Sequence, residues 1–374
     1  MKILYYFQEL DTPMFQWQRR HFIEELSHHN VEIETFNPLF YSNVDEANEK
    51  LLLRVEKGRY DLFISNLGYY KMLYVETLET IKKKGIPTLR IAWDNLMIPY
   101  IDKVLSPHFD LVWLTSKETQ SLYKKWGANT FFATYAANPY TFTYKKPFSV
   151  NRHACFVGTP HGSRAIMINN LTTNGMDVDL YHGGNQSTHV ENDGIQVKYN
   201  MIVPSTKETI INRFKFAEGR KLLLGSLVNK FKGQTYVIKN NQLHQYPGLS
   251  HEEMINTYSS SVLSLSSSSA GHTDVLEKPL KIVNLRNFEI PMCGGIQICK
   301  YSDELASYYE DGKEIVFYST DDELVDKAKY YMGKATDTVI YNIKEAARKK
   351  TERDHNWWKR FQLAFNLLGL QYDK

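Results

Sequence analysis

Cysteine is scarce in this chain of 374 residues, which holds only Cys155, Cys293 and Cys299. An odd set of cysteines without CxxC spacing argues against a disulfide framework and against a cysteine-based zinc site. Free cysteines are typical of a reducing compartment. We therefore expect a cytoplasmic location.

Long apolar runs are also missing. No stretch of about 18 consecutive apolar residues occurs, so the sequence predicts no membrane-spanning helix. The first residues, MKILYYFQELD, are too short for the apolar region of a signal peptide and are typical of a first β-strand.

The net charge of +3 and the pI near 8.4 make the chain only mildly basic. We therefore expect no nucleic-acid partner. Segment 207–233 is locally basic, with seven Lys or Arg residues and two Glu residues. Such a surface is either simply solvated or peripheral to an anionic membrane, such as the inner face of the cytoplasmic membrane.

Several catalytic signatures are absent. The chain has no P-loop, no GxGxxG fingerprint and no GxSxG elbow. HEEMI (251–255) lacks the second histidine of HExxH, because position 255 is Ile. Asp177, Val178 and Asp179 match a DxD metal motif, but the motif begins the strand-like run VDLYHGG (178–184), so we predict a strand there and no metal.

The pattern that is present is an alternation of short apolar runs and amphipathic helices, which predicts parallel sheets covered on both faces. Strands are expected at 2–7, 31–36, 60–65, 87–93, 110–115 and 130–135, and a second series begins at 154–158. Residues 185–249 are less regular.

The sequence thus predicts an α/β protein of two Rossmann-like domains with parallel sheets facing a central cleft. We place a first domain at 1–137, a linker at 138–152 and a second domain at 153–354. The apolar helical segment 355–374 is expected to pack back on the first domain. Ligands of such sheets bind beyond the carboxyl ends of the strands.

The stretch NLRNFEIPMCGG (284–295) is the first candidate for a ligand site. Arg286 offers a forked donor for phosphate, and Glu289 can accept from two vicinal hydroxyls. Gly294 and Gly295 would permit close backbone approach. The alternative is an Arg–Glu pair on an amphipathic helix that ends in a glycine cap.

Other candidates follow strands. Gly158 and Arg164 form a strand–glycine–helix turn that can receive a phosphate. Asp94, in AWDNL, could be a general base, a hydroxyl ligand or a helix cap. Tyr69 and Asn95 are candidates for contact with a substrate.

Several motifs in order resemble the bacterial glycosyltransferases grouped with the spore-maturation CgeB proteins, close to the retaining GT-B transferases. They are FVGTPHGSR, VDLYHGG, LSHEEMINTYSSSVLSLSSSS, LRNFEIPMCGG, DELASYYEDGKEIVFYSTDDEL and DHNWWKR. The resemblance covers most of 150–365; in the first domain it rests on YAANPYTF and the strand order. The sequence departs from those families at Lys281, where they carry an acid, and in its first turn, which lacks Gly-Gly.

The resemblance implies that 1–137 is an acceptor domain, where Tyr69 and Asn95 would contact the acceptor, and that 153–354 is a nucleotide-sugar donor domain. It also implies roles for individual residues. Glu289 would hold the donor ribose, and Arg286, Arg164 and Gly158 would lie near the diphosphate. Gly248 and Leu249 would border the base slot, and Ser268 belongs to the serine-rich turn of the donor site.

The expected function is therefore that of a metal-independent hexosyl- or related glycosyltransferase, without a cofactor. It would move a sugar from a nucleotide-diphosphate sugar to a hydroxyl of a glycan, lipid-linked or protein acceptor. The setting would be bacterial surface glycan synthesis: polysaccharide, lipopolysaccharide or glycoprotein. Asp94 would be the catalytic residue. Two alternatives stay open: a non-catalytic nucleotide-sugar or glycan-binding protein, and a nucleotide-sugar epimerase of the same fold.

Overall fold

The computed structural model describes residues 1–10, 13–183, 203–232 and 236–372. Gly184 of the expected strand segment, Gly233 of the basic segment and the last two residues lie outside this range. The chain divides into two compact units. Unit 1 holds Met1–Thr134, the described part of 189–223 and the chain from Trp357; unit 2 holds the described part of 135–188, and Leu224–Asn356.

Unit 1 contains a six-stranded parallel sheet in the order β2-β1-β3-β4-β5-β6. Its strands are β1 (Lys2–Tyr6), β2 (Glu32–Phe36), β3 (Leu62–Ser65), β4 (Thr88–Ala92), β5 (Leu111–Leu114) and β6 (Thr130–Phe132). The order reverses between β1 and β3, so the carboxyl ends of these two strands flank the position where ligands of open α/β sheets bind.

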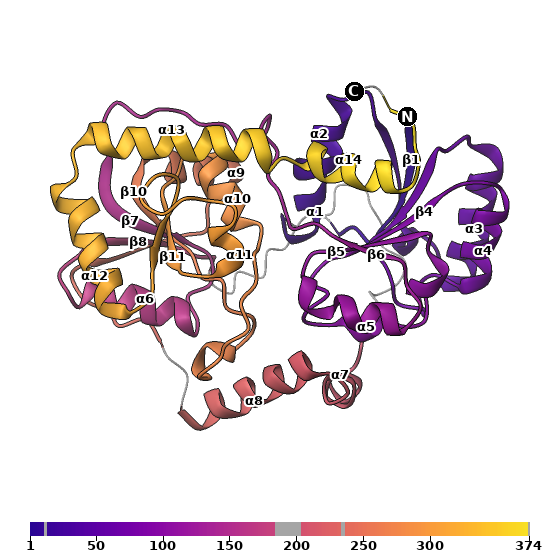
Figure 1. The fold of residues 1–374 in the computed structure, drawn as a ribbon, viewed down its shortest axis with the longest axis horizontal. Helices are drawn as coiled ribbons and strands as arrows, with labels where there is room; N and C mark the ends of the chain where they lie inside the picture. Colours follow the sequence, from indigo (N-terminus) through magenta and orange to yellow (C-terminus); the bar gives the residue numbers. More distant parts are fainter. Residues whose placement is uncertain (11–12, 184–202, 233–235, 373–374) are drawn as a thin grey trace. The chain divides into compact units, whose positions relative to one another are not determined.

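Helices cover both faces of this sheet (Figure 1). The helices of unit 1 are α1 (Pro13–Gln18), α2 (Glu24–Ser27), α3 (Val44–Lys57), α4 (Val75–Lys83), α5 (Gln120–Lys125), α7 (Thr206–Arg213) and α14 (Trp357–Leu367), with a π-helical turn, Arg19–Ile23, between α1 and α2. Because strand side chains alternate, Leu4 and Tyr6 enter one core cluster, whereas Tyr5 stacks on Phe7 on the other face.

The C-terminal helix α14 packs in unit 1. The ring of Phe361 contacts Phe22 and Trp113, and the two oxygens of Glu25 accept hydrogen bonds from the backbone N–H groups of Trp357 (3.1 Å) and Trp358 (2.8 Å). Glu25 thus satisfies N–H groups at the start of α14 that have no partner within the helix.

Unit 2 contains the second six-stranded parallel sheet, in the order β12-β11-β10-β7-β8-β9. Its strands are β7 (Asn151–Val157), β8 (Val178–Tyr181), β9 (Leu243–Tyr246), β10 (Ser261–Leu265), β11 (Gln297–Lys300) and β12 (Val316–Tyr318). This is the order 3-2-1-4-5-6 of dinucleotide-binding sheets, and it reverses between β7 and β10.

The helices of unit 2 are α6 (Ser163–Thr172), α9 (His251–Ser260), α10 (Arg286–Met292), α11 (Asp303–Ala306), α12 (Asp321–Lys329) and α13 (Asp337–Asp354). Buried residues of α6, α12 and α13, such as Ile168, Leu324 and Ile340, pack on one sheet face against Phe156 and Ile298. The predicted α/β architecture with two parallel sheets is therefore confirmed.

The less regular stretch contains two helices, α7 and α8 (Ala217–Lys232), and strand β9. The division between the units passes through α8, and residues 203–223 are counted with unit 1. The sequence-based boundaries had assigned this segment to the second domain. Contacts of α7 explain the difference: Tyr100 donates to Thr209 at 2.8 Å, and Tyr69 donates to the carboxylate of Glu208 at 3.1 Å.

Candidate functional site

Gly158 and Arg286 meet at the reversal point of the unit 2 sheet. Gly158 directly follows β7 and has a φ of 135°. A Cβ atom at this position would lie 2.7 Å from Nη2 of Arg286. A side chain larger than hydrogen would displace the guanidinium, so the backbone after β7 and Arg286 form one contact although they are distant in sequence.

Arg164 adds a second positive charge to this contact. It lies in the first turn of α6, and its Nη1 donates to the carbonyl of Thr159 at 3.3 Å. Partial burial, and then the charge of Arg286, lower the pKa of the Arg164 guanidinium. Like charges held together in a partly buried place favour an anionic ligand between them.

Neither guanidinium has a carboxylate partner within the part of the chain that the structure describes. The arginines that form ion pairs there include Arg19, Arg54, Arg90, Arg152, Arg348 and Arg353. Glu289, three residues after Arg286, does not pair with it. The surface Arg–Glu pair that was the alternative interpretation of this helix is therefore not formed.

A hydrogen-bonded loop fixes where α10 begins. Asn284 accepts from the backbone N–H of Arg286 at 3.0 Å, and its amide donates to the carbonyl of Ser267 at 3.2 Å. The start of α10 is thereby tied to the loop after β10. Glu289 lies one turn further on the same helix, half-buried, and both its charge and that of Arg286 act on buried Tyr258.

The serine-rich loop after β10 brings hydroxyls to the same edge. The hydroxyls of Ser266 and Ser268 are buried and have no hydrogen-bond partner among the described residues. Ser163, at the start of α6, bonds to Ser267 at 2.9 Å. Buried polar groups normally have partners, so two orphaned hydroxyls at a sheet's ligand edge indicate a place for a polar ligand.

A pocket of about 200 Å³ adjoins this loop at the carboxyl ends of β10, β11 and β12. Its lining includes Ser163, Ser268 and two cations, Lys281 and Lys300. Lys281, which stands where the families that the sequence resembles carry an acid, donates to the carbonyl of Tyr301. The pocket therefore has no acid at that position.

Gly248 lies in the loop after β9. A Cβ atom there would be 3.1 Å from the backbone nitrogen of Gly183, so the loops after β8 and β9 run closely side by side. Tyr181 and Tyr246, the last residues of these strands, stack with ring centroids 5.0 Å apart. Leu249 follows Gly248, and the exposed ring of Tyr246 was missed by the sequence analysis although it directly precedes Pro247.

Gly294 and Gly295 lie elsewhere. They form the turn from α10 into β11, and such a turn is at the opposite edge of a parallel sheet from its ligand-binding end. A Cβ atom on Gly294 would lie 2.3 Å from the ring of Tyr144, and one on Gly295 would lie 2.8 Å from Cγ2 of Ile290. The structure does not bring these glycines to Gly158 and Arg286, and close packing accounts for both.

Asp94 is the second residue after β4 and is exposed. Its φ is 51°, a left-handed conformation that is uncommon outside glycine. Strained backbone is concentrated at functional sites, and here it turns an acidic side chain outward at a sheet's carboxyl edge.

Asn95, the next residue, is almost fully buried, and its amide is used within unit 1. Its oxygen accepts from the backbone N–H groups of Thr115 and Ser116, both at 2.9 Å, and its nitrogen donates to the carbonyl of Ser116 at 2.8 Å and to Thr119. An amide offers two donors and two lone pairs. No capacity is left for an acceptor, so Asn95 supports the loop that carries Asp94.

Tyr69 is also buried, and its hydroxyl is bound to Glu208 of α7. Asn66 was missed, although it follows β3 at the reversal point of the unit 1 sheet. Its side-chain oxygen is buried without a hydrogen-bond partner among the described residues. The position directly after a buried strand was the available signal.

Comparison with known proteins gives a consistent result. Residues 215–366 match a family model described as glycosyl transferase-like, a stretch that includes Arg286 and Glu289 but neither Gly158 nor Arg164. No curated protein sequence matches the chain.

Solved structures match along nearly the whole chain. An α-glucosyltransferase in complex with UDP and a DNA containing an HMU base has a TM-score of 0.59 at 12% identity, covering 99% of both chains. The Anabaena protein HepE in complex with UDP has a TM-score of 0.56 at 12% identity, covering 99% of this chain and 100% of HepE. Sucrose-phosphate synthase from Thermosynechococcus elongatus has a TM-score of 0.54 at 12% identity, with 99% and 100% covered.

This protein has the GT-B fold. The solved structures confirm the predicted fold class, and the family model confirms the resemblance to glycosyltransferases over residues 215–366. The narrower resemblance to the CgeB branch stays a prediction. Among the described residues, no helix of this GT-B protein is both long and apolar enough to cross a bilayer.

Proposed function

We propose that this GT-B protein transfers a sugar from a nucleoside-diphosphate sugar to a hydroxyl acceptor. The observation that carries the proposal is the pair Arg164 and Arg286, held beside Gly158 without a carboxylate partner in the described chain. The solved structures of HepE and of the α-glucosyltransferase, which have the same fold, contain UDP. This supports a uridine nucleotide as the first donor to test.

The chemistry assigned to unit 2 is stabilisation of the leaving diphosphate. Two guanidiniums give charge-assisted, forked hydrogen bonds, and the start of α6 adds backbone N–H groups and a positive helix dipole. These charges would act where negative charge develops in the transition state, so no metal is needed for this step. Glu289 would bind the ribose hydroxyls, and Gly248 and Leu249 would border the base.

The acceptor is assigned to unit 1, with Asp94 as the acid–base or hydroxyl-orienting residue. Its exposed carboxylate and its left-handed backbone support this role. Replacing Asp94 by Asn should abolish transfer while donor binding persists. If wild type binds donor and neither transfers nor hydrolyses it, the chain is a binding protein; interconversion of sugars without an acceptor would indicate an epimerase.

The finer setting that we propose is synthesis of a bacterial surface glycan at a membrane. Helix α8 carries an exposed apolar stripe, Leu224, Leu227 and Phe231, with Lys221 and Lys230 on the same helix. Apolar and basic residues together favour an anionic bilayer surface. The protein should co-sediment with vesicles containing anionic lipid and not with neutral ones; equal recovery with both would remove the membrane from the proposal.

The experiment that tests the function is a thermal-shift panel of UDP-, GDP-, CDP- and dTDP-sugars in EDTA. A ligand present at a hundred times its Kd stabilises the folded state by about 2.7 kcal/mol. We expect a shift with one base, reduced in Glu289→Ala and retained in Glu352→Ala, a control glutamate exposed on α13. No shift with any of these donors in wild type would contradict the proposal.

A further inference from the structure

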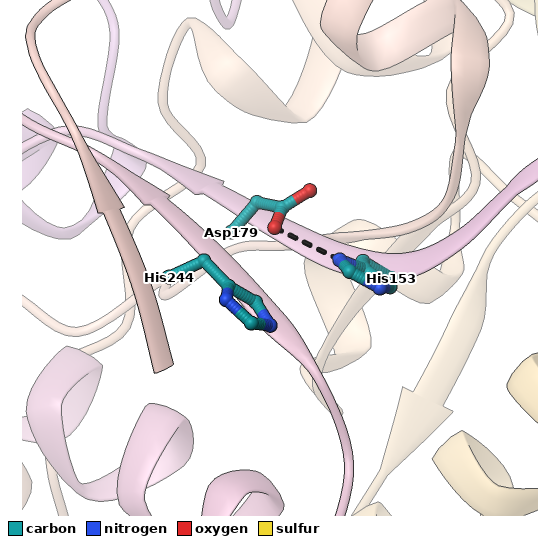
Figure 2. A group of neighbouring side chains, drawn as sticks. All are labelled: His153, Asp179 and His244. Carbon is teal, nitrogen blue, oxygen red and sulfur yellow. Dashed lines mark hydrogen bonds and ion pairs between the residues drawn. The ribbon is translucent and has the colours of Figure 1, made fainter. Parts of the chain in front are cut away.

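A group of metal-ligating side chains lies in unit 2 outside the site described above. His153 of β7, Asp179 of β8 and His244 of β9 each present a ligand atom, and these atoms all lie within 4.8 Å of one another. Figure 2 shows the three side chains turned toward one another, with the hydrogen bond of 2.9 Å between Nδ1 of His153 and Oδ1 of Asp179. Two imidazoles and one carboxylate are a ligand set suited to zinc.

Strand register explains why these residues meet. Asp179 lies opposite His244 in the β8–β9 pair and opposite Cys155 in the β7–β8 pair. His153 is two residues before Cys155, so all three side chains emerge on one face of the sheet. On the other face, the alternate residues Ala154, Val178 and Leu243 belong to the hydrophobic core.

The exposure of these side chains suits an ion-binding site. Asp179 is buried, with 4% of its surface exposed, whereas both histidine rings are about one-third exposed, at 37% and 34%. The two rings lie nearly parallel, with centroids 5.1 Å apart and an interplanar angle of 15°. The carboxylate of Asp179 therefore lies at the buried side of the group, and an ion could reach it from solvent past the partly exposed imidazoles.

A second carboxylate orients one of the imidazoles. Asp177 lies 3.0 Å from Nε2 of His244, and because an ionised carboxylate only accepts, this nitrogen carries the hydrogen. Nδ1 of His244 is then left with the lone pair that a metal needs. A carboxylate bonded to the far nitrogen of a ligand histidine is the usual outer partner at zinc sites. Asn151 similarly donates to Oδ2 of Asp179 at 3.2 Å.

We propose that His153, Asp179 and His244 bind a divalent transition-metal ion, with Zn²⁺ as the best fit, and that Asp177 orients His244. Bonds of about 2.1 Å at tetrahedral angles place ligand atoms roughly 3.4 Å apart. The atoms present already approach this spacing, and side-chain rotations would close the rest. On binding, the ion would displace the hydrogen of the bond between Nδ1 of His153 and Oδ1 of Asp179.

The role assigned to the ion is structural. It would join three neighbouring strands whose carboxyl ends carry Gly158, Tyr181 and the loop with Gly248. Asp179 and His244 lie two residues before Tyr181 and Tyr246, one layer of side chains behind the stacked tyrosines. The group is thus separate from the two arginines, and this inference does not depend on the proposed transfer reaction.

The test is titration of the tag-free wild-type protein with ZnCl₂ by calorimetry, paired with thermal melting in zinc and in EDTA. We expect one ion per chain and a higher Tm in zinc. Asp177→Asn should weaken binding by about 10- to 100-fold, and both His153→Ala and His244→Ala should abolish it. The exposed His28 of unit 1 supplies the control His28→Ala, which should bind as wild type does.

Cobalt gives an independent readout of geometry. A tetrahedral site should produce visible absorption with Co²⁺ in wild type and in His28→Ala, lost in Asp179→Asn. If the alanine variants unfold, Asp177→Asn and Asp179→Asn still decide the outcome, because they change charge and not size. Failure of wild type to bind stoichiometric zinc, or equal zinc affinity in wild type and in Asp179→Asn, would overturn the proposal.

Discussion

The two units contain two kinds of arginine, and they differ in their partners. In unit 1, Arg90 of β4 is buried and its Nε lies 2.7 Å from Oδ1 of Asp102, whose other oxygen accepts from Tyr123. In unit 2, Arg164 and Arg286 have no carboxylate partner among the described residues, and each lies in the field of the other.

The comparison separates structure from ligand binding. A guanidinium that is neutralised and hydrogen-bonded within its own domain has no capacity for a ligand. Removing one partner of such a buried pair destabilises the domain. Two guanidiniums held together without a counter-ion repel each other in the free protein, and a bound anion would relieve this repulsion. The same residue type thus forms a structural pair in unit 1, whereas in unit 2 it supports the diphosphate site that we propose.

The largest effect should come from breaking the structural pair. Asp102→Asn keeps the shape of the side chain but leaves Arg90 charged and buried, which should destabilise the protein by about 3–5 kcal/mol. Asp337→Asn, which removes an exposed partner of Arg152, should change stability little. Urea unfolding of both variants measures the difference, and similar midpoints would mean that burial does not distinguish the two pairs.

A smaller effect is expected at the contact between Gly158 and Arg286. Gly158→Ala forces a side chain into a φ of 135° and displaces the guanidinium. Strained backbone of this kind costs about 1–3 kcal/mol, and UDP affinity should fall with stability. Gly333→Ala is the matched control, because nothing lies within 4 Å of its added Cβ. If Gly158→Ala binds UDP as tightly as wild type does, the position of Arg286 does not contribute to the donor site.

A third effect accumulates with pH and concerns Glu25, a buried carboxyl that accepts hydrogen bonds from backbone N–H groups. Burial raises the pKa of Glu25 to about 8. A carboxyl with a raised folded-state pKa holds a proton in the folded protein and not in the unfolded one between the two pKa values. Stability should therefore fall as pH rises from about 5 to 8, by at most about 1.4 kcal/mol per pH unit.

The variant Glu25→Gln tests whether stability falls as pH rises because of Glu25. Its glutamine does not titrate, so its stability should fall less than that of wild type across the same pH range in denaturant unfolding. A wild-type protein that gains stability relative to Glu25→Gln as pH rises would show that the carboxylate is the favoured form beside α14.

Much of the fold could be predicted because its strands are short apolar runs between amphipathic helices. KILYY and LFIS became β1 and β3 within one or two residues of the expected bounds. Helix α8 could not be recognised in this way, because Leu224, Leu227 and Phe231 are exposed and mark no buried face. Strand β9, LHQY, was missed because it has no apolar run.

The site was harder to predict from the sequence. The motifs and the resemblance to a known family named Gly158, Arg164 and Arg286, but only the fold shows that the first and last touch. Gly294 and Gly295 were placed with them because sequence adjacency to Glu289 hides the reversal of direction between a helix and the next strand. Asn95 was chosen for its position after β4, and its five bonds within unit 1 were not visible in the sequence.

The most direct test of the two kinds of arginine is calorimetric titration of UDP into wild type, Arg164→Met and Arg286→Met, with urea unfolding of each. Hydrogen bonds to charged groups contribute about 1.5–3 kcal/mol. UDP affinity should therefore fall at least tenfold in each variant, while unfolding stability stays equal or rises because repulsion is removed. Unchanged UDP affinity together with lost stability would contradict the account, since these arginines would then be structural, as Arg90 is.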